Sequence, residues 1–104
     1  MRTTDSGCCE PFLKALGDKT RWRIVGELLC NPVTVSELAQ RLKVSQYNTS
    51  KHLRILRDAG IVEAVRRGKN VYCRIAPAYA RRNGGRKKQL DLGCCAFRFE
   101  KSRN

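Results

Sequence analysis

Two pairs of adjacent cysteines are the residues of this chain whose type and spacing most clearly allow chemistry. Cys8 and Cys9 lie near the N-terminus, and Cys94 and Cys95 lie near the C-terminus. Adjacent thiolates offer two sulfur ligands that the chain already holds together, which suits soft ions such as arsenite, antimonite, bismuth, cadmium and mercury. We therefore predict that Cys8, Cys9, Cys94 and Cys95 bind a soft metal or metalloid ion.

A trivalent arsenic site takes three thiolates, so one pair would need a further sulfur ligand. The other pair, Cys30 or Cys73 could supply it, although we interpret Cys30 and Cys73 mainly as small, half-buried apolar residues. The spacing is not the CxxC…CxxC that is typical of structural zinc. The alternative is that one or both pairs are incidental thiols in mobile ends of the chain.

A second group of candidate residues has side chains that bind nucleic acid. A predicted helix over 46–58 carries polar residues on the side away from its apolar stripe, namely Gln46, Tyr47, Asn48, Ser50, Lys51 and Arg54. Gln and Asn can each form two hydrogen bonds with adenine, and Ser can donate or accept one. The predicted hairpin that follows is basic through Arg66, Arg67, Lys69 and Arg74. A polar helix face beside a basic hairpin is typical of a DNA-binding protein.

Several local signals predict the elements that position these residues. Apolar spacing predicts helices over 10–17, 19–30, 35–42 and 46–58, with Trp22 as a core residue of the second one. Asp18, Thr34 and Ser45 are the expected N-caps, and Glu37 completes a capping box with Thr34. Strands are predicted over 61–67 and 71–75 around a turn at 68–70. The region 78–93 is ambiguous, because a helix could begin at Ala78 but Gly84 and Gly85 should stop it. Residues 91–99 could be extended.

Composition and charge narrow the class of protein. The chain has 104 residues, enough for one small domain, and a formal net charge of +13, which favours a polyanionic partner. The positive charge is concentrated in residues 65–104, where a second basic cluster follows the hairpin: Arg81, Arg82, Arg86, Lys87 and Lys88. No apolar run is long enough to span a membrane, and the N-terminus lacks the apolar core of a signal peptide. We therefore expect a cytoplasmic protein with reduced thiols.

The same sequence gives little support for an enzyme. No CxxC lies in a βαβ pattern, and no glycine-rich loop that could hold phosphate is present. The single histidine, His52, follows Lys51 and has no evident acid–base partner, and we interpret it as a phosphate contact or a helix-packing residue instead of a metal ligand. We predict that the chain is not an enzyme.

Three consecutive segments resemble the ArsR/SmtB family of winged-helix repressors. They are FLKALGDKTRWRIVGELL, TVSELAQRL and VSQYNTSKHLRILRDAGIVEAVRRGKNVYCRI, and the resemblance covers roughly Pro11 to Ile75. The resemblance implies a homodimer that binds an imperfect palindrome in double-stranded DNA and releases it when an inducer, usually a metal or metalloid ion, binds. By position it implies two sets of DNA-binding residues: Ser45, Gln46, Tyr47, Asn48, Ser50, Lys51 and His52 on the recognition helix, and Arg66, Arg67, Lys69 and Asn70 on the wing.

The chain also departs from the family pattern in three places. The arsenic-type motif ELCVCDL, expected near 33–38, is replaced by VTVSEL, and the final helix rich in His and Asp of the zinc and nickel sensors is absent. The usual long last helix is interrupted at Gly84 and Gly85. The resemblance implies that the first and last elements meet at the dimer interface, where Cys8–Cys9 and Cys94–Cys95 could come together within or between subunits. Members of the family use N-terminal or C-terminal cysteines as inducer sites.

The sequence thus predicts a mainly helical α+β fold, a winged helix-turn-helix with a two-stranded wing, acting as a homodimer. We expect a flexible segment over 1–9, the DNA-binding domain over 10–77 and a basic segment over 78–104. The predicted function is a repressor with no obligatory cofactor, released from its operator by an ion such as As(III) or Sb(III). The alternatives are a redox- or persulfide-sensing repressor of the same fold and a nonspecific basic nucleic-acid-binding protein.

Overall fold

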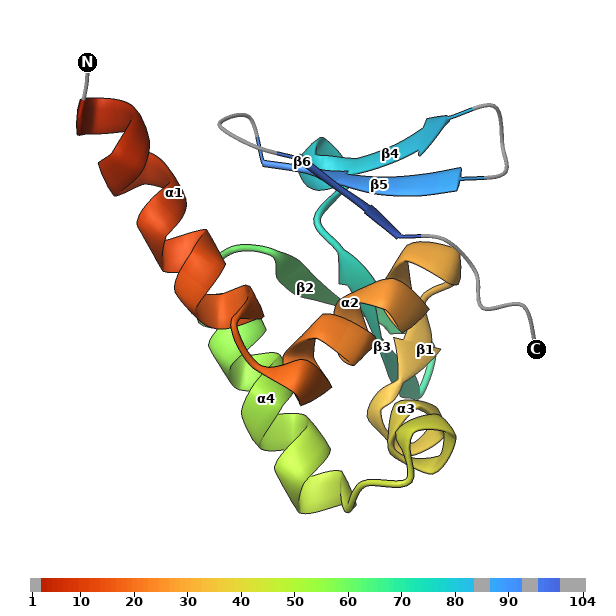
Figure 1. Ribbon diagram of the computed structural model, residues 1–104. Helices are drawn as coiled ribbons and strands as arrows, with labels where there is room; N and C mark the ends of the chain where they lie inside the picture. The colour runs from red at the N-terminus through yellow and green to blue at the C-terminus, as the bar shows by residue number, and fades with distance from the viewer. Residues whose placement is uncertain (1–2, 84–86, 93–95, 100–104) are drawn as a thin grey trace.

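The computed structural model of the chain describes residues 3–83, 87–92 and 96–99, and it is a winged helix-turn-helix with a second small sheet (Figure 1). This confirms the predicted fold class. The helices are α1 (Thr3–Leu16), α2 (Lys19–Cys30), α3 (Val35–Leu42) and α4 (Gln46–Asp58), with a short 3₁₀ helix at Pro77–Tyr79. The strands are β1 (Val33–Thr34), β2 (Val62–Arg67), β3 (Asn70–Ile75), β4 (Ala80–Asn83), β5 (Lys87–Asp91) and β6 (Ala96–Phe99).

Side-chain caps start the central helices, as predicted. The Asp18 carboxylate accepts hydrogen bonds from the backbone N–H groups of Thr20 and Arg21, at 2.9 and 3.1 Å. The Thr34 hydroxyl accepts from the N–H of Glu37 at 3.2 Å, while the Glu37 carboxylate accepts from the N–H of Thr34 at 3.1 Å. These bonds satisfy N–H groups that have no partner inside the helix, so each helix begins at a defined residue.

Helices α3 and α4 form the helix-turn-helix around a sharp turn. Lys43 adopts a left-handed backbone conformation, with φ of 59°, and ends α3. Ser45 then caps α4, because its hydroxyl accepts from the N–H of Asn48 at 3.1 Å. The inward side of α4 buries Thr49, Leu53 and Leu56, and the two leucines join apolar residues of α2, α3 and β2 in one core. This packing leaves the opposite side of α4 in solvent.

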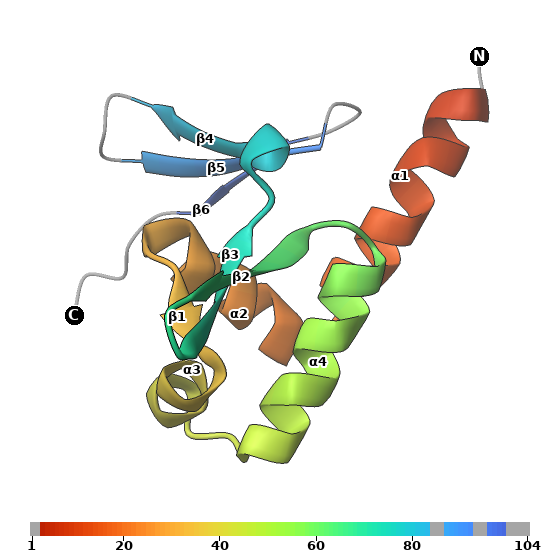
Figure 2. The ribbon, with the colours of Figure 1, turned by 180° about the vertical axis from the view of Figure 1, so that it is seen from behind.

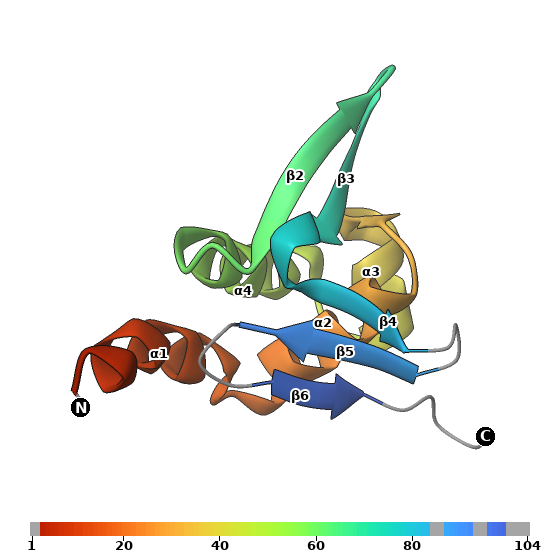
Figure 3. The same cartoon turned by 90° about the horizontal axis from the view of Figure 1, so that it is seen from above.

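The β2–β3 hairpin is the wing, and Figure 3 shows it projecting beyond the helices. Its antiparallel register pairs Val62 with Ile75 at the base and Arg67 with Asn70 at the tip. Gly68 in the turn has φ of 61°, a conformation that favours glycine. The short strand β1 joins the other edge of β3, where Val33 pairs with Cys73. The base of the wing is thereby tied into the core, and the tip extends from it.

Helix α1 differs from the prediction at its start. It begins at Thr3 instead of residue 10 and continues through Pro11, so residues 3–9 have helical backbone where we expected a flexible segment. Proline lacks an N–H and usually disfavours the interior of a helix, which is why the sequence indicated a later start. The end of α1 buries Ala15 and Leu16 in the core.

The ambiguous region after the wing forms a second antiparallel sheet in the order β4–β5–β6. Strand β4 ends at Asn83 and pairs with β5, which begins at Lys87, while Gly84 and Gly85, which we expected to stop a helix, are outside the described residues. Leu90 and Leu92 are buried, and the rings of Phe97 and Phe99 lie 5.4 and 4.5 Å from the ring of Trp22 on α2. Trp22, predicted as a core residue, is instead 38% exposed and forms the contact between α2 and this sheet.

Candidate nucleic-acid interface

One side of α4 presents the polar residues that the sequence assigned to DNA contact. Five residues that both the polar pattern and the family resemblance assigned are exposed, namely Gln46, Tyr47, Asn48, Ser50 and Lys51, and so are Ser45 and Arg54. Tyr47 is 77% exposed, whereas the intervening Thr49 is fully buried. This set of five is called the exposed face of α4 below. It combines amide, hydroxyl and ammonium groups, which are the donors and acceptors that bind base edges and phosphates.

Two polar side chains at the start of α4 also make contacts within the protein. The Gln46 side-chain amide donates to the Ser36 hydroxyl of α3 at 2.9 Å, which links the two helices of the helix-turn-helix. The hydroxyl of Ser45, the N-cap, accepts from the N–H of Asn48, so it retains its proton for donation. Ser36 was not among the predicted site residues, because the sequence does not show that α3 and α4 approach at this point.

The wing carries the second predicted set. Arg66, Arg67, Lys69 and Asn70 are all exposed near the hairpin turn. Within the part of the chain that the structure describes, Arg66, Arg67 and Lys69 form no ion pair. Arg74, at the base of the wing, does form one: its guanidinium lies 2.5 Å from the carboxylate of Glu63 on the paired strand. The uncompensated charge of the wing is therefore near its tip.

Figure 2 shows that α3, the N-terminal end of α4 and the wing lie toward one side of the molecule. The second sheet and the N-terminal end of α1 lie toward the other side. The exposed face of α4 and the wing can therefore contact one extended polyanion together. An α-helix fits the major groove of DNA, and a basic hairpin beside it can contact the phosphate backbone.

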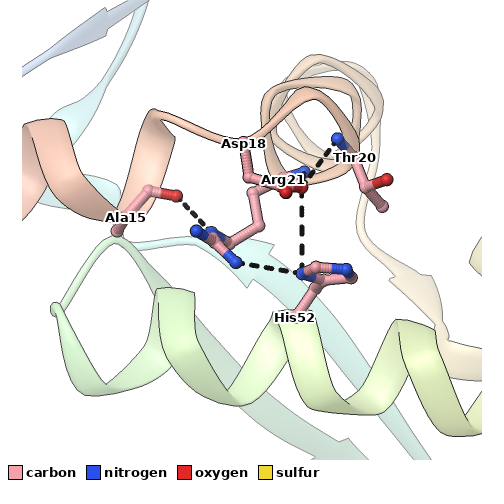
Figure 4. A network of polar contacts seen from close by, with 5 residues as sticks. All are labelled: Ala15, Asp18, Thr20, Arg21 and His52. Carbon is pink, nitrogen blue, oxygen red and sulfur yellow. Dashed lines mark hydrogen bonds and ion pairs between the residues drawn. The ribbon is translucent and has the colours of Figure 1, made fainter.

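His52 lies apart from the exposed face of α4 (Figure 4). Its side chain is 21% exposed and points toward α2, where its Nδ1 atom is 3.1 Å from the Arg21 guanidinium and 3.9 Å from the Asp18 carboxylate. The sequence did not indicate Arg21, because the contact joins residues 31 positions apart. The resemblance placed His52 among the DNA-binding residues, and the structure places it between helices.

The cysteines are distributed over several elements. Cys8 and Cys9 belong to the helical backbone of α1, and Cys94 and Cys95 lie outside the described residues. Cys30 is half-buried at the end of α2, and burial of Cys73 on β3 raises the pKa of its thiol. A raised pKa disfavours the thiolate that binds metals, so Cys73 is a poor third ligand. In the described residues, no three His, Cys, Asp or Glu side chains cluster to hold a metal.

Comparison with known proteins places the helix-turn-helix and part of the wing in one family. The model of the family described as "Bacterial regulatory protein, arsR family" matches residues 18–64. The transcriptional repressor SmtB homolog of Synechocystis sp. is 40% identical over 62% of this chain and 49% of its own length. The HTH-type transcriptional regulator YuzN of Bacillus subtilis is 42% identical over 62% of this chain and 77% of its own length. The chain thus spans about half the length of the SmtB homolog.

Solved structures agree with these similarities. Reduced HlyU from Vibrio cholerae has a TM-score of 0.67 and 33% identity, over 70% of this chain and 77% of that one. A homodimeric winged helix-turn-helix DNA-binding domain from Mycobacterium bovis has a TM-score of 0.64 and 30% identity, over 67% of this chain and 65% of that one. The cadmium sensor CmtR from Mycobacterium tuberculosis has a TM-score of 0.58 and 36% identity, over 64% of this chain and 69% of that one.

Proposed function

Because the chain belongs to the ArsR family of bacterial regulatory proteins, a family of regulators and not of enzymes, we propose that it is a transcriptional repressor that binds DNA. The observation that supports this proposal is that α4 carries exposed polar residues and the wing carries uncompensated charge, on elements that lie toward one side of the molecule. Asn48, which lies on that face, would read bases in the major groove. Arg66, Arg67 and Lys69 would bind phosphates.

The proposed repressor acts as a homodimer on a palindromic operator. Support comes from the related DNA-binding domain from Mycobacterium bovis, which is homodimeric. A twofold dimer that reads DNA with one helix per subunit places the two helices in successive major grooves, about 34 Å apart. The expected operator therefore has two half-sites related by inversion, with centres separated by one turn of DNA.

For the inducer, we propose a soft ion bound by the vicinal thiolates Cys8, Cys9, Cys94 and Cys95, with As(III), Sb(III) and Cd(II) as the ions to test. Support comes from the ligand chemistry of adjacent thiols and from the similarity to a cadmium sensor. Cys8 and Cys9 are consecutive in the chain, so no loop has to close for the pair to offer two sulfur ligands. The second candidate is a redox switch, which the similarity to HlyU, described in its reduced form, favours.

Selection of bound sites from a library of random DNA tests the DNA-binding function even though the operator sequence is unknown. We expect enrichment of an inverted repeat, with protected half-sites one helical turn apart. The same selection with random RNA is the control. Enrichment of no DNA motif, together with binding that depends only on salt, would contradict the repressor function and favour a nonspecific basic protein.

A further inference from the structure

A single arginine of α2 connects three helices (Figure 4). The Arg21 Nε atom donates a hydrogen bond to the backbone carbonyl of Ala15, in the last turn of α1, at 2.5 Å. One terminal nitrogen of the same guanidinium lies 3.1 Å from Nδ1 of His52, on α4. The backbone N–H of Arg21 donates to Asp18, the N-cap of α2, at 3.1 Å. Arg21 therefore joins the end of α1, the start of α2 and the middle of α4.

The contact with Arg21 favours one of the two neutral forms of the His52 ring. A guanidinium has only N–H donors, so Nδ1 of His52 accepts in this hydrogen bond. In the neutral imidazole that makes this bond, the proton is on Nε2. Asp18 lies 3.9 Å from Nδ1, which is too long for a hydrogen bond. The bond between Arg21 and His52 is thus the polar contact that fixes the ring.

The other inward residues of α4 provide little to fix its rotation. Leu53 and Leu56 make apolar contacts, which are not directional. The Thr49 hydroxyl donates to the carbonyl of Ser45, the N-cap of the same helix, at 2.8 Å. Gln46 holds the first turn of α4 to α3 through Ser36. His52 lies further along the helix, and a directional bond there constrains the angle at which the exposed face of α4 points outward.

We propose that Arg21 is a positioning residue for DNA reading, which sets the orientation of α4 relative to the end of α1 through neutral His52. This inference rests on the proposed base reading by α4 and specifies how that face is held. It predicts that loss of the link lowers preference for the operator over random DNA, because a misaligned helix keeps its charges but loses its aligned hydrogen bonds.

Nuclear magnetic resonance tests the link itself. His52 is the only histidine in the chain, so its ring nitrogens need no assignment against others. Above the pH at which the ring protonates, we expect the Nε2–H form in the wild type and a mixture of the two neutral forms in Arg21→Gln. Arg23→Gln removes the same charge from an exposed position of α2 and should leave the wild-type form. A proton on Nδ1 in the wild type, or no change in Arg21→Gln, would overturn the proposal.

Binding to a selected operator and to random DNA tests the consequence for reading. Relative to Arg23→Gln, which corrects for the lost charge, Arg21→Gln should lower the ratio of operator to random affinity about tenfold. His52→Leu should also lower it, and the double variant should lose no more than Arg21→Gln alone, because both changes break the bond between Arg21 and His52. His52→Asn should bind more selectively than His52→Leu, since its amide oxygen can accept near the position of Nδ1.

The outcomes separate this proposal from the proposed function. Circular dichroism at the binding temperature should show that each variant is folded. Arg21→Lys provides a second test with a smaller change, because it keeps the charge but cannot make the bonds to both Ala15 and His52. The wild type could prefer its operator while Arg21→Gln and Arg21→Lys show the same ratio of operator to random affinity as Arg23→Gln. In that case only the positioning role is wrong. Additive losses in the double variant would also contradict the positioning role alone. If the wild type shows no preference for any DNA sequence, base reading and the positioning role are both wrong.

Discussion

Asp18 stabilises the start of α2 through hydrogen bonds to backbone N–H groups, and these bonds have a consequence for pH. The N–H of Arg21 is the main cause that holds the pKa of Asp18 below its ordinary value, and the charge of Arg21 adds to it. A carboxyl whose pKa is lowered by folding stabilises the native state above its unfolded pKa. This stabilisation is lost as the pH falls through the lowered folded value.

Replacing Asp18 therefore gives the first prediction. Asp18→Ala should reduce the free energy of unfolding at pH 7 by about 1 kcal/mol, through loss of the cap. Asp18→Asn should lose less at pH 7, because its amide oxygen can still accept. Urea denaturation from pH 7 down to about 3, below the ordinary pKa of Asp, should show a steeper loss of stability in the wild type than in Asp18→Asn. Parallel pH profiles for the two proteins would contradict this account of the cap.

Individual residues differ in how far the sequence could predict them. The caps Asp18, Thr34 and Ser45 were predictable because each acts on N–H groups two or three positions along the chain. The contact of His52 with Arg21 was not predictable. The two residues are 31 positions apart, and Arg21 reaches His52 only when α2 packs on α4. Trp22 occurs at a helical apolar position, but only the folded second sheet shows what it contacts.

At the scale of the elements, the wing was predictable and the second sheet was not. Alternating residues and the turn at Gly68 indicate a hairpin from local sequence. The segments that form β4 and β5 flank two glycines. Glycines occur both in turns between strands and at the ends of helices, so the local sequence did not decide between a hairpin and a helix. Pairing of Ala80 and Phe97 with the buried Leu90 decides it in the fold. The turns of α1 before Pro11 were not predicted either, because a proline usually disfavours the interior of a helix.

The wing gives the second prediction. Lys69→Ala should weaken binding to operator and random DNA alike and reduce the slope of log affinity against log salt by about one, because one phosphate contact is lost. Arg74→Gln is the matched control, since it also removes one positive charge, but from an ion pair with Glu63 at the base of the wing. Fluorescence anisotropy over a range of salt concentrations measures both slopes. An equal change of slope in the two variants would show that only the total charge matters.

The cysteine pairs give the third prediction. Replacing Cys94 and Cys95 with Ser should leave operator affinity nearly unchanged, because neither belongs to α4 or the wing. The same change should raise the arsenite or cadmium concentration needed to release DNA. Cys8 and Cys9 replaced in the same way should have a smaller effect, since flanking apolar residues in DLGCCAFRF offer the second pair more support.

Three outcomes of that titration distinguish the inducers. Release by a soft ion that needs the pairs supports the proposed ion sensor, and release by an oxidant alone, again dependent on the pairs, supports the redox switch. If a variant with all four cysteines replaced still releases DNA at the wild-type ion concentration, and oxidants release neither protein, thiol sensing is wrong. The nonspecific or constitutive DNA-binding function would then be favoured.

Considered as a whole, the molecule separates two surfaces. The N-terminal end of α4 and the wing lie toward one side, and the second sheet and the N-terminal part of α1 lie toward the other (Figures 1 and 2). The ring of Phe12 on α1 meets that of Tyr79, which precedes the second sheet, at 5.6 Å. A sheet thus lies against α2 in the region where the sequence interrupts the long last helix that is usual in the family. In the described residues, no helix has the length and apolar character needed to cross a membrane.

Asn48 provides the most direct test of base reading by α4. It is an exposed residue, whereas the Gln46 amide also holds Ser36, so a Gln46 variant would disturb the helix-turn-helix as well. Affinities of the wild type and Asn48→Ala should be measured on a selected operator and on random DNA at the same salt concentration. We predict a loss of about 1–3 kcal/mol on the operator, with relaxed preference at the contacted base, and little loss on random DNA. Equal losses on the two DNAs would contradict sequence reading by this helix.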